Sequence, residues 1–133
     1  MENIIQLFTE KFGDVDLEKL NKYVKFCQEN VYDGCDEYSE EHHILLKRHF
    51  PEYKTDAWNI VRLKYDDHVE AHRLLYMVLP KLRAAFYAYF MLKSNTRDGI
   101  DSDIRAENVK WLTGDNNPAK NPEVRAKISA RGV

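Results

Sequence analysis

Five histidines are the residues of this 133-residue chain best suited to chemistry, and all of them lie within 31 consecutive positions. They are His42, His43, His49, His68 and His72. An imidazole can bind a transition metal or transfer a proton near neutral pH. His68 and His72 are four positions apart at the start of an expected helix, so their rings share one face and can bind a single ion. Spacing alone leaves open that both are solvated surface residues.

His42 and His43 precede the apolar run Ile44-Leu45-Leu46. Histidines in an apolar segment are costly to bury unless each finds a partner. A metal ion is one such partner, and the alternative is a pair of hydrogen-bonded core histidines.

The elements that position these residues follow from apolar periodicity and turn signals. Three- and four-residue apolar steps predict helices over residues 3–11 and 17–30, the second capped by Asp16. Part of 38–48 is expected to be a strand, 50–57 a connection, and the alternating segment 59–65 a second strand. Helices over 67–79, capped by Asp66 or Asp67, and 81–93 follow, with a break at Pro80.

The run Glu40-x-His42-His43-Ile44, then Asn59-Ile60-Val61-x-Leu63, then His68 and His72, resembles the HNH (ββα-metal, His-Me finger) nucleases over residues 38–79. It is most similar to the nuclease colicins and the small HNH and homing endonucleases of bacteriophages. In that family two metal-binding histidines follow the Asn by nine and thirteen positions, which is the spacing here. Leu46 departs from the pattern, since phage relatives often have Pro there.

The resemblance implies a role for each residue of the motif. His42, His68 and His72 would bind one divalent ion, with Zn, Mg, Mn and Ni all open, and His43 would be the general base. Asn59 would orient the connection between the strands, and Glu40 would be a metal-side hydrogen-bond partner, a phosphate-side acid or simply solvated. Neighbours in a strand point to opposite faces, so His42 and His43 can act on one site only at a strand end or bulge. His49 matches no motif position and is expected at the surface.

DNA contacts are expected from basic residues near this motif and from the C-terminal tail. The tail, Gly114 to Ser129, resembles the nuclease-associated DNA-binding module of phage homing endonucleases, with a short basic helix over 123–130. A frayed basic tail is the alternative. Residues expected to contact phosphate are Lys47, Arg48, Lys54, Arg62, Lys64 and Arg73, with Asn116, Asn117, Lys120, Arg125 and Lys127 in the tail.

Charge is distributed unevenly along the chain. The total of −2 argues mildly against a nucleic-acid partner. However, residues 1–41 carry eleven acidic and four basic residues, whereas 47–93 carry nine basic and five acidic ones. The acidic N-terminal region is either a solvated helical face or a contact for a homodimer or protein partner.

Length and composition allow one domain and an arm, and exclude a multi-domain chain. The predicted fold class is α+β, mainly helical, with a central ββα-metal motif, N-terminal helices and an extended basic C-terminal arm. The expected divisions are a nuclease domain over 1–93 (helical segment 1–36, core 38–79, helix 81–93), a linker over 94–113 and the module over 114–133. The linker is expected to hold a short apolar anchor at Val109, Trp111 and Leu112. Cys27 and Cys35 are expected as reduced thiols in the cytoplasm, that of a bacterial host if the chain is phage-encoded.

The predicted function is a metal-dependent endonuclease that nicks or cuts double-stranded DNA, leaving 5′-phosphate and 3′-hydroxyl ends. Two alternatives stay open: a non-catalytic DNA-binding protein with a structural zinc ion, and a nuclease toxin or factor that needs a partner.

Overall fold

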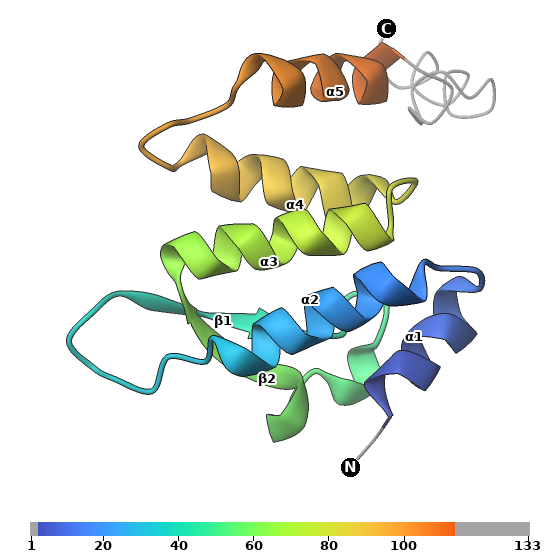
Figure 1. The fold of residues 1–133 in the computed structure, drawn as a ribbon, viewed down its shortest axis with the longest axis vertical. Helices are drawn as coiled ribbons and strands as arrows, with labels where there is room; N and C mark the ends of the chain where they lie inside the picture. The colour runs from blue at the N-terminus through green and yellow to red at the C-terminus, as the bar shows by residue number, and fades with distance from the viewer. Residues whose placement is uncertain (1–2, 114–133) are drawn as a thin grey trace, which may run out of the picture. The chain divides into compact units, whose positions relative to one another are not determined.

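The computed structural model describes residues 3–113, which contain five α-helices and a two-stranded antiparallel sheet (Figure 1). The predicted α+β, mainly helical class is therefore confirmed. The chain forms two compact units, the first ending at Leu92 and the second beginning at Lys93. The tail residues Asn116, Asn117, Lys120, Arg125 and Lys127, with the helix expected over 123–130, lie outside the described residues.

Two capped helices open the first unit, as their periodicity predicted. Helix α1 spans Ile4–Phe12, and the Asn3 side chain accepts a hydrogen bond from the Gln6 backbone N–H at 3.1 Å. Helix α2 spans Leu17–Glu29, and Asp16 accepts from the Lys19 N–H at 3.2 Å. These bonds satisfy backbone donors that have no partner inside a helix.

The sheet pairs β1 (Ser39–His43) with β2 (Ile60–Lys64), in a register that sets His42 opposite Val61. Residues 44–59 join the strands and include two short 3-10 helices, Pro51–Tyr53 and Ala57–Asn59. Asn59 was predicted to start the second strand. It ends a 3-10 helix instead, because its side chain is bonded to the connection.

Helix α3 (Tyr65–Val78) begins directly after β2. Its N-cap is Lys64, without a side-chain hydrogen bond, so the predicted cap at Asp66 or Asp67 is wrong. Both aspartates lie in the first turn, where negative charge still interacts favourably with the helix dipole. The break predicted at Pro80 is confirmed, and helix α4 (Arg83–Ser94) follows it.

Helices α2 and α3 lie side by side, and both pack against the sheet (Figure 1). The core between these elements contains Phe8 and Tyr23 from the N-terminal helices, Leu63 from β2 and Leu75 from α3, each almost fully buried. Helix α4 joins through the Tyr76 and Phe86 rings, whose centroids are 5.2 Å apart. The Tyr65 hydroxyl donates to the Leu92 carbonyl at 2.6 Å. The core of the unit thus lies between the helices and the two-stranded sheet.

The segment predicted as a linker over 94–113 contains a helix, because α5 spans Ser102–Thr113. Asp101 accepts a hydrogen bond from the Ile104 N–H at 2.8 Å, which starts a helix in a polar segment. Of the expected apolar anchor only Trp111 is buried, since Val109 and Leu112 are about half exposed. Within the described range, no helix is long and apolar enough to cross a membrane.

The two cysteines are free and lie in opposite environments. Cys27 is fully buried in α2, and burial raises the pKa of its thiol to about 12 despite a hydrogen bond with Tyr23 that lowers it. Cys35 is exposed. Because the thiolate is the reactive form, Cys27 should be inert in the folded protein.

We therefore expect native protein at neutral pH to show one fast-reacting thiol toward a disulfide reagent, and two after denaturation. Absorbance of the released thiolate measures both. Cys35→Ser should abolish the fast reaction. If Cys27→Ser, and not Cys35→Ser, lost the fast reaction, the burial of Cys27 would be contradicted.

Candidate metal centre

Three of the predicted residues, His42, His68 and His72, come together between β1 and α3. One ring nitrogen from each lies within 4.8 Å of the others. The ring centroids are 4.8 to 5.2 Å apart. A tetrahedral ion bound at about 2.1 Å needs its nitrogens about 3.4 Å apart, so binding requires the nitrogens to approach one another by at most about 1.4 Å.

Sheet register and helix periodicity produce this convergence. Glu40 and His42 alternate onto one face of β1, the face that also carries the buried Leu63 of β2. His68 and His72 are one turn apart on α3, which packs against β1. The alternation of side chains along β1 and the turn of α3 therefore bring the three histidines to the same place.

Burial suits these imidazoles to metal binding. His42 is 2% exposed, and burial, with the charges of His72, His68 and His43, lowers the pKa of its ring well below the usual value. Burial and His68 lower the pKa of His72 to about 3, although Glu40 opposes this. Neutral rings hold a free lone pair at pH 7, which a metal ion requires. His72 Nδ1 is also buried and has no hydrogen-bond partner within residues 3–113, which fits a side chain that takes a ligand.

Glu40 lies beside the cluster as a hydrogen-bond acceptor. Its Oε1 is 2.9 Å from His68 Nδ1, and its Oε2 accepts from the Tyr38 hydroxyl at 2.6 Å. Although burial opposes ionisation, the bonds from Tyr38 and His68 lower the pKa of Glu40. Glu40 therefore orients a neighbouring imidazole as an ionised carboxylate, an arrangement typical of the residues around metal ligands.

His43 is the last residue of β1 and lines the same cavity as the cluster, a hollow of about 240 Å³. A second hollow, of about 470 Å³, is also lined by His43, together with Lys47, Lys54 and Thr55. The Nε2 of His43 is 2.9 Å from the Lys54 carbonyl oxygen. Because a carbonyl only accepts, Nε2 carries the proton and Nδ1 is left able to accept one. The strand end thus gives His42 and His43 access to one cavity.

Asn59 is fully buried beneath this strand end. Its Oδ1 accepts from the Leu45 N–H at 2.7 Å, and its Nδ2 donates to the carbonyls of Leu45 and Tyr53 at 3.3 and 3.1 Å. Its own carbonyl accepts from the Ile44 N–H at 2.9 Å. Asn59 therefore holds the chain that leaves His43.

The basic residues predicted to contact DNA differ in their partners within the protein. Lys47 and Arg48 are at the rim of the histidine cavity. Arg62 instead bonds Ser39 at 2.8 and 3.0 Å, Lys64 pairs with Glu37 at 2.8 Å, and Arg73 pairs with Glu70 at 2.5 and 2.7 Å. Only the first two border the cluster without a pairing acid among the described residues.

Two residues near the centre have no signal in the sequence. Tyr23 bonds His42 from α2, and Tyr38 bonds Glu40, but in the sequence each is one aromatic among sixteen. His49, expected at the surface, packs against Phe12, with ring centroids 5.4 Å apart, and its Nδ1 is buried. It lies outside the cluster.

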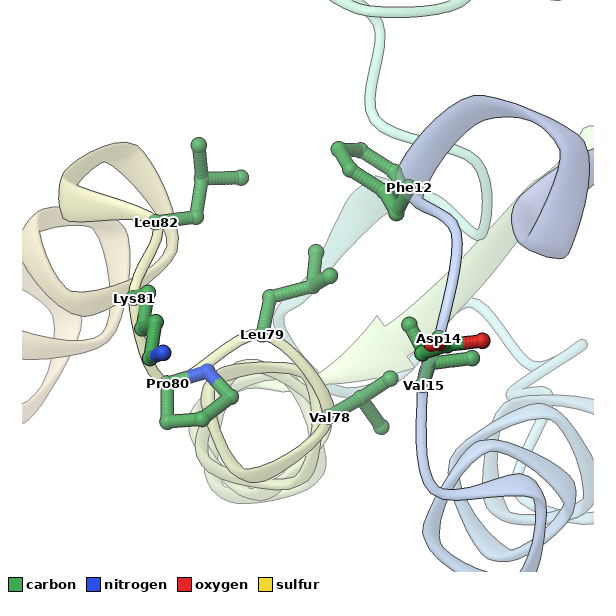
Figure 2. Close-up of a pocket in the computed structure, with 8 residues that line it drawn as sticks. All are labelled: Phe12, Asp14, Val15, Val78, Leu79, Pro80, Lys81 and Leu82. Atoms are coloured by element: carbon green, nitrogen blue, oxygen red, sulfur yellow. The ribbon is translucent and has the colours of Figure 1, made fainter.

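A separate cavity of about 370 Å³ is lined mainly by apolar side chains from the end of α1 and from the turn between α3 and α4 (Figure 2). Phe12 faces Leu79 and Leu82 across the hollow in Figure 2. None of the histidines lines it, so it is separate from the cluster between β1 and α3.

Comparison of the chain with models of protein families, with curated proteins and with solved structures found no match.

The bonds of Asn59 predict a large effect on stability. In Asn59→Ala the Leu45 N–H and two carbonyls lose their partner, and a buried unsatisfied group costs about 1–3 kcal/mol. We expect the free energy of unfolding, measured by urea denaturation, to fall by about 3 kcal/mol.

The matched control is Asn30→Ala, which removes one partly buried bond to the Phe26 carbonyl of 2.8 Å. Its loss should be about 1 kcal/mol or less. Equal losses in the two variants would contradict the structural role of Asn59.

Proposed function

We propose that the chain is a metal-dependent DNA endonuclease of the HNH type, with His42, His68 and His72 holding one divalent ion and His43 as general base. The observation that carries the proposal is the three-histidine cluster, with His43 lining the same cavity. The strand, connection, strand and helix order around it also agrees with the resemblance seen in the sequence. The chemistry suits phosphodiester hydrolysis to 5′-phosphate and 3′-hydroxyl ends.

In this proposal the metal ion, the general base and the basic side chains have separate roles in hydrolysis. A bound divalent ion supplies positive charge for the pentacoordinate phosphorus and the leaving 3′-oxygen. His43 Nδ1 takes a proton from the attacking water, while the Lys54 carbonyl holds the other side of the ring. Lys47 and Arg48 contact the phosphates that flank the scissile bond, which adds affinity but little sequence recognition. Magnesium, manganese, nickel and zinc are the candidate ions, and double-stranded DNA is the proposed partner.

The number of ligands favours this function over a DNA-binding protein with a structural zinc ion. Structural zinc sites are closed by four protein ligands, whereas catalytic sites keep an open position. Among the described residues the cluster offers three. Glu40, which lies beside them, bonds His68.

Plasmid cleavage in the presence of Mg²⁺, Mn²⁺, Ni²⁺ or Zn²⁺ tests the proposal. His43→Ala should lower the cleavage rate by about 100-fold or more while leaving metal affinity unchanged, since His43 is not in the cluster. His49→Ala is the matched control, because it removes a histidine outside the site, and it should cleave like the parent. Absence of metal-dependent cleavage, or equal rates in the three proteins, would refute the nuclease.

The same proposal predicts which basic side chains of the protein bind DNA. Lys47→Ala and Arg48→Ala should each reduce the slope of log affinity against log salt by about 0.9, the value for one phosphate contact. Arg73→Ala should change it less, because Glu70 already binds that guanidinium. Fluorescence anisotropy across a salt series measures the slope.

Lys25→Ala is the control, since Lys25 is exposed on α2 and pairs with Glu29 at 3.7 Å. Equal changes in all four variants would indicate diffuse electrostatic attraction, and would rule out a phosphate site at the cavity rim.

A further inference from the structure

Tyr23 connects helix α2 to the strand end that carries His42. The side chain is fully buried. Its hydroxyl oxygen lies 2.8 Å from His42 Nε2 and 2.7 Å from the carbonyl oxygen of Ile44. One hydroxyl therefore binds both a candidate metal ligand and the backbone just beyond His43.

Counting protons assigns the direction of each bond. A carbonyl oxygen only accepts, so the single hydroxyl proton of Tyr23 goes to Ile44. The neutral Cys27 thiol, which also bonds this hydroxyl, then donates to its oxygen. The bond to His42 must then run the other way, with His42 Nε2 as the donor and the Tyr23 oxygen as the acceptor. A neutral imidazole has one N–H, which leaves the lone pair of His42 on Nδ1.

His68 carries the opposite assignment. Its Nδ1 is 2.9 Å from a carboxylate oxygen of Glu40, and an ionised carboxylate only accepts. The proton of His68 is therefore on Nδ1 and its lone pair on Nε2. By these assignments the lone pairs of the two rings are on different nitrogens, and each is set by a partner outside the cluster.

We propose that Tyr23 is a positioning residue that holds His42 in its Nε2–H form, so that the ion is bound by Nδ1 of His42 and by Nε2 of His68. The inference rests on the metal site of the proposed function, but not on the cleavage reaction. Without the Tyr23 hydroxyl, His42 can place its proton on either nitrogen. A fraction of the molecules then presents an N–H to the cluster, where a metal ion needs a lone pair.

Nitrogen NMR of the full chain tests the assignment without any substitution. In metal-free, ¹⁵N-labelled protein, long-range ¹H–¹⁵N correlations distinguish the two neutral forms of each imidazole. We expect His42 as Nε2–H and His68 as Nδ1–H, and zinc should shift the Nδ1 resonance of His42 and the Nε2 resonance of His68. An Nδ1–H form of His42, or zinc bound at its Nε2, would overturn the proposal.

Tyr23→Phe tests the role of the hydroxyl. Zinc affinity should fall about 10- to 100-fold, as for other partners of metal ligands, and His42 should show a mixture of neutral forms. The matched control is Tyr65→Phe, which also removes a hydroxyl bond to a backbone carbonyl, that of Leu92, and touches no histidine of the cluster. The control should bind zinc like the parent and leave His42 unchanged.

The outcomes separate the two proposals. Zinc binding with the expected nitrogen assignments but without DNA cleavage would refute the nuclease and support the role of Tyr23. The parent protein could instead cleave DNA while Tyr23→Phe changes neither the zinc affinity nor the His42 resonances. That result would support the nuclease and overturn the role of Tyr23. Failure of the parent protein to bind zinc or the other divalent ions would overturn both.

Discussion

Burial of the His42 imidazole is the constraint on which the rest of the centre depends. A polar ring in a core loses its hydration, and its nitrogens must find partners there. Tyr23 supplies one partner from α2, and the cluster with His68 and His72 lies on the remaining side. Because α2 and α3 both pack against the sheet, the same core that stabilises the unit also holds these side chains in place. The packing of the core therefore fixes the relative positions of the three rings.

A second buried polar group, Asn59, serves the neighbouring side chain. The residues between the two strands form no long helix or strand of their own, so their backbone groups need other partners. Asn59 provides three of these bonds with its side chain and a fourth through its carbonyl. His43 leaves the strand where this connection begins, and the Lys54 carbonyl in the same connection orients its ring. A residue without a role in chemistry thus determines where the proposed base stands.

Electrostatics separate the face proposed to bind DNA from the rest of the unit. The acids of the N-terminal region include Glu37, whose charge Lys64 offsets at the surface, and Glu40, which accepts a hydrogen bond from the His68 ring. Lys47 and Arg48 remain at the cavity rim. The overall charge of −2 consequently says little about the partner, since the local field at the site decides which ligand approaches.

The sequence by itself determined the α+β class, most of the helices, and the pairing of His68 with His72, because each depends on periodicity within one element. It failed at α5, where a single Asp101 cap outweighs a polar composition, and at the start of α3, where the backbone of Lys64 takes the place of an aspartate cap. The resemblance in the sequence implied that His42 joins His68 and His72, and the structure brings the three together. The tertiary structure alone decided that Tyr23 bonds His42. It also decided that Arg73 pairs with an acid, whereas Lys47 and Arg48 have no such partner among the described residues. The contacts of His42 join residues far apart in the chain. They depend on strand register and helix packing, which no local pattern encodes.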